Sequence, residues 1–211
     1  MVKRLFISDL DRTIFDCDRF YIDICKQLQK KDILSNQQLS EITLLLQDLL
    51  TNPYLSDLIT RYRLEEAVVA AVVQNLTPNK YVYPDVKGWL QNIKPAELII
   101  LTTGIAKYQE MKFQVSPMLA PYPHRVIKQP NKGSYLLKRL KYSNVGLKII
   151  GLADEKWYQQ LVLIDDRNYN LNALASSARV KLFHIRRPTE KMRDLDIAPA
   201  VSDISSFKEV A

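Results

Sequence analysis

Two carboxylates one residue apart, Asp9 and Asp11, follow an apolar run near the start of the chain, Leu5-Phe6-Ile7. Alternate residues of a strand point to the same side, so both acids begin on one face. Open α/β sheets bind their ligands at the carboxyl ends of strands. Two acids that converge there are costly without a cation between them, and their oxygens suit Mg²⁺. An isolated Asp-x-Asp is also a common turn, so the later segments must decide between these interpretations.

Three later segments also put polar side chains next to predicted strands or helices. The apolar run 98–101 ends in a hydroxyl-rich turn, a lysine opens an amphipathic helical stretch over 134–140, and the apolar run 161–164 ends in two acids. The polar residues are Thr102, Thr103 and Gly104 in the first segment, Lys132 in the second, and Asp165 and Asp166 in the third. Parallel strands would bring these residues to one edge of a sheet.

The order of these motifs resembles that of the haloacid dehalogenase-like superfamily of phosphotransferases, over about residues 2 to 185. Its first motif is matched by Asp9, Asp11 and Thr13, its second by Thr102, its third by Lys132, and its fourth by Asp165 and Asp166. The first and fourth motifs are specific when they occur together. Arg12 departs from the pattern, because many members carry glycine at this position and use its backbone.

The resemblance implies a phosphoryl-transfer mechanism. Asp9 would attack phosphorus and form an aspartyl-phosphate, while Asp11 would protonate the leaving oxygen and then take a proton from water. Thr102, with the backbone N–H groups of Thr103 and Gly104, would bind the phosphoryl oxygens. Lys132 would neutralise the phosphoryl group and the acids.

Mg²⁺ is the expected cofactor, held by Asp9, the backbone carbonyl of Asp11, Asp165 and Asp166. Asp165 is preferred as the direct ligand because it comes first after the strand, and Asp166 would bind through water or hold Lys132. Two alternatives stay open at this point. Lys128 competes with Lys132 for the third motif, and Thr102 could simply cap a helix.

Alternating strand and helix patterns predict a Rossmann-like parallel sheet covered by helices on both faces. This α/β catalytic core is expected over residues 1–16 and 84–211. Between them, residues 17–83 show helical periodicity, with Ser35 as a cap before one helix and Asn52-Pro53 after it. In the family, an all-helical cap domain that selects the substrate often occupies this place.

The composition fits a globular chain of 211 residues with a net charge of +7. Its basic residues include a group at 138–148 and another at 179–187, but they are interpreted as a scattered solvated surface, so nucleic acid is a less favoured partner than a small phosphorylated molecule. Cys17 and Cys25 predict free thiols in a reducing compartment. The chain shows neither a signal peptide nor a transmembrane segment, which favours a cytoplasmic protein without a membrane role. The oligomeric state stays open.

These features together favour a Mg²⁺-dependent phosphatase acting on a small phosphate monoester. A nucleotidase is one alternative, and a phosphatase acting on nucleic-acid ends, suggested only by the basic charge, is another. A non-enzymatic alternative is a catalytically silent module that binds a phosphorylated ligand on the same fold. Dehalogenation is also compatible with the fold, although Asp11 favours the hydrolysis of a phosphate ester.

Overall fold

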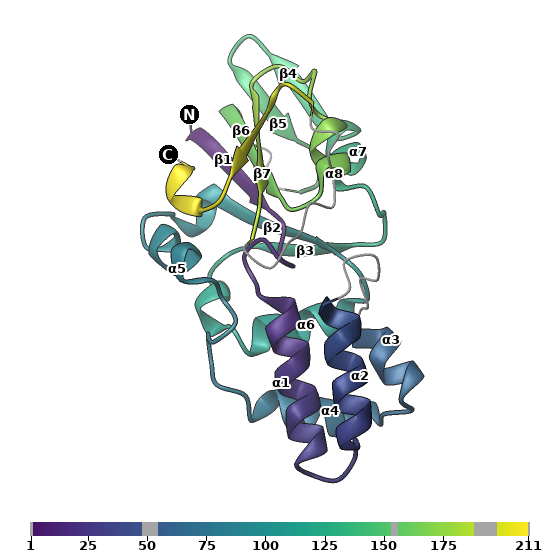
Figure 1. Ribbon diagram of the computed structural model, residues 1–211. Coiled ribbons are helices and arrows are strands. Elements are labelled where there is room, and N and C mark those ends of the chain that lie inside the picture. The colour runs from purple at the N-terminus through teal and green to yellow at the C-terminus, as the bar shows by residue number, and fades with distance from the viewer. Residues whose placement is uncertain (1, 48–54, 153–155, 188–197, 211) are drawn as a thin grey trace. The chain divides into compact units, whose positions relative to one another are not determined.

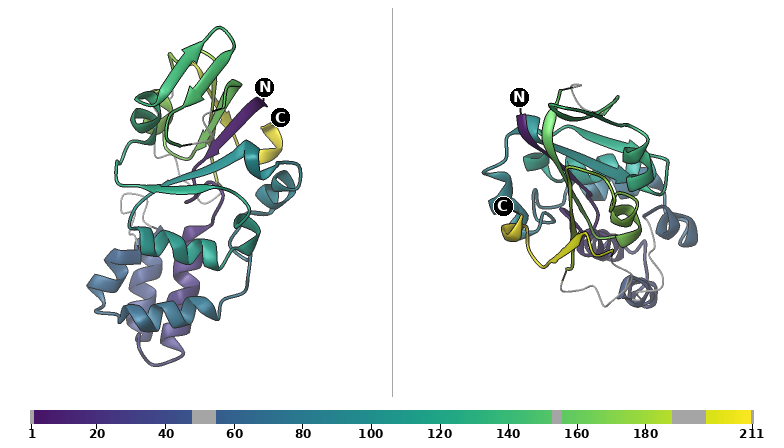
Figure 2. Two further views of the ribbon diagram at one scale, coloured as in Figure 1. Left: turned by 180° about the vertical axis from the view of Figure 1, so that it is seen from behind. Right: turned by 90° about the horizontal axis from the view of Figure 1, so that it is seen from above.

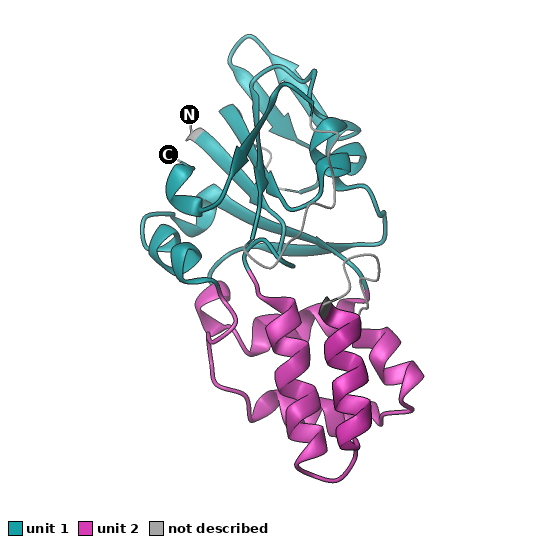
Figure 3. Cartoon of the chain, viewed as in Figure 1, with its two compact units in different colours: residues 1–14, 83–104, 121–211 teal, residues 15–82, 105–120 magenta. Residues whose placement is uncertain are grey.

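The computed structural model describes residues 2–47, 55–152, 156–187 and 198–210 (Figure 1). The chain divides into two compact units (Figure 3). Unit 1 comprises Met1–Ile14, Tyr83–Gly104 and Pro121–Ala211, and unit 2 comprises Phe15–Val82 and Ile105–Ala120. The chain therefore passes from unit 1 into unit 2 twice.

Unit 1 contains an eight-stranded sheet, seen from two further sides in Figure 2. The parallel strands are β1 (Val2–Ser8), β2 (Leu98–Thr103), β3 (His124–Ile127), β6 (Tyr158–Asp165), β7 (Val180–Ile185) and β8 (Val201–Ile204). The order is β3-β2-β1-β6-β5-β4, with β7 also beside β6, and β8 beside β7. β4 (Leu140–Ser143) and β5 (Gly146–Ile149) form an antiparallel hairpin that joins the first residue of β6. The predicted Rossmann-like α/β fold is confirmed.

Alternate residues of the central strands bury apolar side chains on both faces of the sheet. On one face, Leu5 and Ile7 of β1 share a core with Leu136 of α7 (Lys132–Leu137) and Leu171 of α8 (Asn168–Asn172). This packing fixes α7 and α8 against the strands whose ends carry the candidate site.

The opposite face of the sheet is covered by the helix after residue 83 and by the C-terminal segment. Phe6 of β1 meets Trp89 of α5 (Pro84–Leu90) edge-on, with ring centroids 5.4 Å apart. Trp89 in turn contacts Phe207 of the 3₁₀ helix η3 (Phe207–Glu209) at 4.7 Å. A further 3₁₀ turn, η1 (Pro95–Glu97), leads into β2. Helices therefore cover both faces, as the burial of parallel strands requires.

Unit 2 is helical. It consists of α1 (Cys17–Gln29), α2 (Asn36–Gln47), α3 (Leu55–Arg61), α4 (Glu66–Gln74), α6 (Ala106–Gln114) and the 3₁₀ helix η2 (Pro117–Leu119). The Ser35 hydroxyl accepts from the Gln38 amide at 3.1 Å, which confirms the predicted cap of α2. A hydrogen bond holds the beginning and the end of segment 15–82 together, because the Asp16 amide donates to the Tyr81 carbonyl at 2.8 Å. The predicted helix end at Asn52-Pro53 lies outside the described residues.

The observed division into units differs from the predicted one at the segment that contains α6. Residues 105–120 were expected in the core, yet they cluster with unit 2. Lys107 of α6 pairs with Glu66 of α4 at 2.6 Å, and the Asn79 amide donates to the Val115 carbonyl at 2.8 Å. These partners anchor the segment within the helical unit. A substrate-selecting role for this unit stays a prediction.

One further expectation about the elements needs correction. The helix expected over 134–140 ends at Leu137, because the chain turns into the β4–β5 hairpin. That hairpin was not predicted. Two further strands, β7 and β8, follow β6. Among the helices that the structure describes, none combines the length and the apolar character needed to cross a membrane.

Candidate active site

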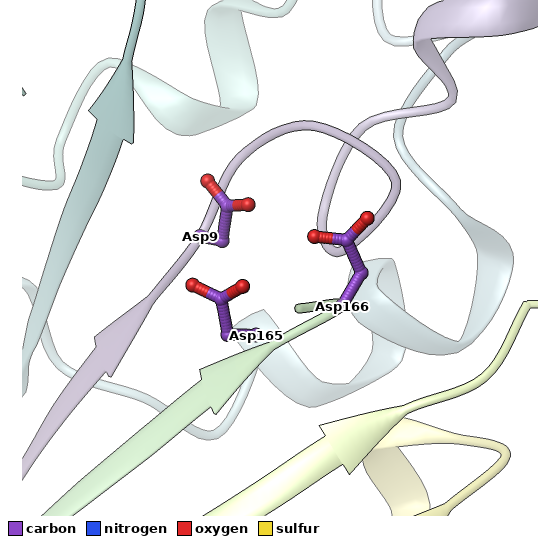
Figure 4. Close-up of side chains that lie close together, drawn as sticks. All are labelled: Asp9, Asp165 and Asp166. Atoms are coloured by element: carbon purple, nitrogen blue, oxygen red, sulfur yellow. The ribbon is translucent and has the colours of Figure 1, made fainter. Parts of the chain in front are cut away.

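Three buried carboxylates, Asp9, Asp165 and Asp166, converge where β1 and β6 end (Figure 4). The two strands pair in parallel with Ser8 opposite Ile164, and the Asp9 amide donates to the Ile164 carbonyl at 2.9 Å. Each acid offers an oxygen, and these oxygens lie within 4.8 Å of one another. The register of two neighbouring strands thus brings together acids that are more than 150 residues apart in the sequence.

Lys132 supplies the positive charge of this cluster. Its Nζ lies 2.7 Å from Asp9 Oδ2 and 2.8 Å from Asp165 Oδ2. The side chain is 3% exposed, whereas the competing Lys128 is exposed. Burial alone would lower the pKa of Lys132, but Asp165, Asp9 and Asp166 outweigh it and raise that pKa, so the ammonium form is favoured. The geometry therefore puts Lys132, and not Lys128, among the acids.

Asp9 lies among several charged groups. Burial raises the pKa of its carboxyl well above the usual value, Lys132 opposes this rise, and Asp165 and Asp166 add to it. The Leu10 amide donates to Asp9 Oδ1 at 2.6 Å, while Oδ2 faces Lys132. Both oxygens are thus oriented by fixed groups.

Asp165 is held by three hydrogen bonds. Oδ2 accepts from Lys132, and Oδ1 accepts from the Arg167 amide and from Asn170 Nδ2, each at 2.9 Å. The sequence analysis offered Asp166 as the residue that might hold Lys132. In the structure Lys132 Nζ contacts Asp165 and Asp9, and which acid would bind a metal directly stays a prediction.

Two positions hold Lys132 and Asp165 together, and the sequence analysis missed the first of them, Asn170. Asn170 of α8 accepts from the Lys132 amide at 2.9 Å through Oδ1 and donates to Asp165 through Nδ2. Gly133 lets α7 approach α8 closely, because a Cβ at this residue would lie 1.9 Å from the Asn170 carbonyl oxygen. The available sequence signal for Asn170 was an asparagine five residues after Asp165.

His184 supports the turn after β6 from the neighbouring strand, β7. Its Nε2 donates to the Asp166 backbone carbonyl at 3.1 Å, and its Nδ1 lies 2.9 Å from Asp203 of β8. Asp203 is also bound by Arg186, with a closest distance of 2.7 Å. The sequence analysis gave His184 no chemical role, because a lone histidine in a strand carries no motif.

The remaining predicted residues lie at the same edge of the sheet or in the adjacent loop. Thr102 is buried in β2, which pairs with β1, while Thr103 is partly exposed and Gly104 is exposed. Thr102 does not cap the following helix, because the N-cap of α6 is Ile105. Asp11 is partly exposed in the loop after β1. Their roles toward a phosphoryl group stay predictions.

Arg12 adopts a backbone conformation that normally favours glycine. Its φ is 56°, and its side chain is 4% exposed. The residue lies between Asp11 and Thr13, so the loop after β1 keeps a left-handed turn without the usual glycine.

The donor set fits a hard divalent cation. Three carboxylates face the Lys132 ammonium group, and Arg167 Nε lies 3.4 Å from Asp166 Oδ2, which leaves one negative charge when all of these groups are ionised. Mg²⁺ carries positive charge and prefers oxygen ligands, including carboxylates. A cation there would also favour the ionised form of Asp9.

Comparisons with solved structures identify the fold. A protein named as a haloacid dehalogenase-like hydrolase from Burkholderia xenovorans superposes with a TM-score of 0.68 at 19% identity, covering 100% of this chain and 95% of that chain. The chain has the haloacid dehalogenase-like fold. The HAD-hydrolase YfnB from Bacillus subtilis, solved bound to magnesium, gives a TM-score of 0.56 at 14% identity, with coverages of 100% and 97%.

Other proteins with the haloacid dehalogenase-like fold differ in their named activities. A protein from Haemophilus somnus named as a phosphoglycolate phosphatase has a TM-score of 0.54 at 15% identity over 99% of this chain and 96% of that chain. A dehalogenase solved with an intermediate has a TM-score of 0.57 at 14% identity, with coverages of 99% and 95%. No protein-family model matches the chain, and a comparison with curated proteins finds no match. The likeness shows the fold, and the activity must be argued from the site.

Proposed function

We propose that this protein is a Mg²⁺-dependent phosphatase that hydrolyses a small phosphate monoester through an aspartyl-phosphate. The observation that carries the proposal is the buried cluster of Asp9, Asp165 and Asp166 around Lys132 at the carboxyl ends of β1 and β6. Several buried acids around a single lysine are costly for stability, and such arrangements are typical of functional sites.

In the proposed reaction, a carboxylate oxygen of Asp9 attacks phosphorus. The bond from phosphorus to the leaving oxygen breaks, its electron pair goes to that oxygen, and Asp11 in its protonated form donates the proton. Asp11 then takes a proton from water, whose oxygen attacks the phosphorus of the aspartyl-phosphate. The phosphorus–carboxylate bond breaks and returns Asp9 as a carboxylate, with inorganic phosphate as the product.

The other residues of the site would bind the phosphoryl group and the metal. Thr102 would donate a hydrogen bond to a phosphoryl oxygen, and Lys132 would balance the charge of Asp9 and Asp165. Mg²⁺ would be held by Asp9, the Asp11 carbonyl, Asp165 and Asp166, and it would stabilise the negative charge that develops on the phosphoryl group. Asp165 accepts hydrogen bonds at both oxygens, and Asp166 Oδ2 lies 3.4 Å from Arg167 Nε, so each of the two acids has a protein partner.

The test is turnover of p-nitrophenyl phosphate with Mg²⁺ and with EDTA, for the wild type and for Asp9→Asn. We expect metal-dependent release of p-nitrophenol that falls at least about 10³-fold in the variant, since loss of a nucleophile removes the main route. Asp18→Asn is the matched control, because Asp18 lies at the start of α1 and not in the cluster. Equal activity of wild type and Asp9→Asn would refute the mechanism.

Dehalogenation is the competing enzymatic activity, since one protein with this fold is named a dehalogenase. Halide release from a 2-haloacid, without hydrolysis of any phosphate ester, would favour it. If the folded protein binds Mg²⁺ but turns over neither substrate, the catalytically silent phospho-ligand module becomes the better explanation. A panel of phosphorylated metabolites, nucleotides and oligonucleotides with terminal phosphates would then separate the substrate classes.

A further inference from the structure

One stretch of the sequence contains many basic residues and no acid. Between Glu110 and Asp154 there is no Asp or Glu, although eight Lys or Arg residues lie in this interval. The sequence analysis interpreted the basic residues as scattered. In the structure, four basic residues of this interval and Arg179 meet along the β4–β5 hairpin, whose two strands are the green arrows at the top of the left view in Figure 2.

The middle of the hairpin carries two lysines directly opposite each other. Lys141 of β4 pairs with Lys148 of β5 in the antiparallel register. Like charges in directly opposed positions destabilise a sheet. Lysine on an edge strand can protect against aggregation, which accounts for Lys141. Protection does not account for Lys148, which lies on the inner strand of the hairpin.

Arginines extend this charge to both ends of the hairpin. At the turn, Arg179 donates to the Asn144 carbonyl at 3.4 Å, and at the other end Arg125 donates to the Gly151 carbonyl. Arg139 lies beside β4, with its guanidinium 3.7 Å from the ring centroid of Tyr135. Four residues of strand span roughly 14 Å, so the positive groups follow the hairpin over its whole length. The next acids in the sequence, Asp154 and Glu155, lie outside the described residues.

An aromatic side chain lies beside the lysine pair. Trp157 is half-buried, and Lys148 Nζ lies 5.3 Å from its ring centroid. Tyr142 is 47% exposed, but it lies opposite Leu147 and one residue from Lys141, so it starts from the other face of the hairpin. Proteins that bind single strands of nucleic acid combine positive groups for the phosphates with aromatic rings on which bases stack.

We propose that the β4–β5 hairpin binds a single strand of nucleic acid, with Lys141, Lys148 and Arg179 against the phosphates and Trp157 against a base. The surface is separate from the candidate active site. The hairpin pairs with Tyr158, the first residue of β6, whereas Asp165 is the last, roughly 23 Å further along the strand. The proposal therefore does not depend on the phosphatase function.

The first experiment measures fluorescence anisotropy of a labelled 12-nucleotide single strand without terminal phosphates, added to the full chain in EDTA. Under these conditions neither hydrolysis nor recognition of a phosphorylated end contributes. We expect binding that weakens with salt, with a slope of log K against log[salt] near −2 for about three neutralised phosphates. Absence of binding at low salt would overturn the proposal, whatever the result of the phosphatase assay.

Paired variants test whether the hairpin is the surface that binds. Lys141→Gln/Lys148→Gln should weaken binding about ten-fold and reduce the salt slope by about 1.4, because two phosphate contacts are lost. The same double variant should melt at a slightly higher temperature, since the opposed charges are gone. Lys26→Gln/Lys30→Gln, at exposed positions of unit 2, changes the net charge equally and should leave binding nearly unchanged. Equal losses in both double variants would overturn the assignment to the hairpin.

The aromatic position distinguishes nucleic acid from other anionic partners. Trp157→Ala should weaken binding about ten-fold, whereas Trp157→Phe keeps an aromatic ring and should bind nearly like the wild type. If Trp157→Ala binds normally and heparin competes as strongly as an unlabelled oligonucleotide, the surface is a general polyanion site and the proposal fails. Binding to phosphatidylserine vesicles but not to the oligonucleotide would also overturn it, in favour of a membrane surface.

Discussion

At the residue scale, the ammonium group of Lys132 offsets the electrostatic cost of burying the acidic cluster in the folded protein. Replacing Lys132 by Met would leave Asp9 and Asp165 buried without their cation, which we expect to cost about 3 kcal/mol of unfolding free energy at pH 7 in EDTA. Urea unfolding measures this loss. Lys128→Met is the matched control, because Lys128 is exposed four residues earlier, and it should change the free energy of unfolding by less than about 0.5 kcal/mol.

The same variant separates a structural lysine from one that belongs to a metal site. Saturating Mg²⁺ should restore part of the stability that Lys132→Met loses, because the cation neutralises the same carboxylates and binds only the folded state. If Lys132→Met is as stable as Lys128→Met in EDTA, then the two ion pairs of Lys132 contribute nothing to folding and the electrostatic argument for the site is wrong.

Variants of Arg12 can measure how much free energy of unfolding is lost when a residue other than glycine adopts a left-handed backbone conformation. Arg12→Gly and Arg12→Ala both remove the guanidinium, so they differ mainly in the ease of reaching a φ of 56°. We expect Arg12→Gly to be more stable than Arg12→Ala by about 1 kcal/mol, although glycine is usually the more destabilising residue. Thermal unfolding of the two variants checks this. A more stable Arg12→Ala would mean that the loop relaxes out of the left-handed conformation.

The sequence pointed to the charged members of the site, and the structure brings Asp9, Lys132, Asp165 and Asp166 together. These residues could be anticipated because each lies at the end of an apolar run or at a helix start, where the fold dictates their position. Asn170 and His184 could not be anticipated in the same way. Their function is to hold a backbone group or a carboxylate of another segment, and such partners depend on tertiary packing.

At the element scale, the position of Lys132 depends on how closely α7 approaches α8. Gly133→Ala would place a Cβ 1.9 Å from the Asn170 carbonyl oxygen and 2.8 Å from the Ala173 Cβ, so the helices must separate. We expect a loss of about 2 kcal/mol in stability and a lower kcat, because Lys132 moves away from Asp165. Unfolding and p-nitrophenyl phosphate turnover measure the two effects.

Gly88 provides the control for this helix contact. It lies within α5, and a Cβ at this residue would meet nothing within 4 Å. Gly88→Ala should therefore raise the stability by up to about 1 kcal/mol, through the better helix propensity of alanine, and leave turnover unchanged. Similar effects of Gly88→Ala and Gly133→Ala would show that the α7–α8 contact has no special importance.

The elements that the sequence analysis missed share a physical cause. The β4–β5 hairpin has strands of only four residues, so the alternation of apolar and polar positions around Lys141 and Lys148 is too short to predict a strand by itself. The register with β6 decides that this segment is extended, and register is a long-range property. The grouping of α6 with unit 2 likewise depends on Lys107 meeting Glu66, a contact that no local pattern predicts.

At the scale of the whole molecule, a buried ion pair ties the C-terminal segment of unit 1 to the loop after β1. Arg187 Nη1 donates to both oxygens of Asp85, at 3.0 and 2.9 Å, and Nη2 donates to the Thr13 carbonyl. Asp85 also accepts from the Phe207 amide at 2.9 Å. Three distant segments of the chain therefore meet at one carboxylate, next to the loop that carries Asp11.

This ion pair should give unit 1 a characteristic dependence on pH. Burial on its own would raise the pKa of Asp85, but the Phe207 amide and Arg187 outweigh it and hold that pKa below the usual value. A carboxyl with a lowered pKa in the folded state contributes stability above its unfolded pKa, about 3.9, and loses that contribution as the pH falls through the folded pKa. Asp85→Asn should therefore cost about 2 kcal/mol at pH 7 and progressively less as the pH falls below about 4.

Tryptophan fluorescence can follow this effect in unit 1 alone, because both tryptophans of the chain, Trp89 and Trp157, belong to that unit. Urea unfolding of wild type and Asp85→Asn between pH 7 and pH 3 gives the difference in unfolding free energy at each pH. Asp57→Asn, at an exposed position of α3, is the matched control and should show a small difference without this trend. If the difference in unfolding free energy between wild type and Asp85→Asn stays constant down to pH 3, the charge of Asp85 does not hold the three segments together. The hydrogen bonds of residue 85 would then be sufficient, since an asparagine amide can keep part of them.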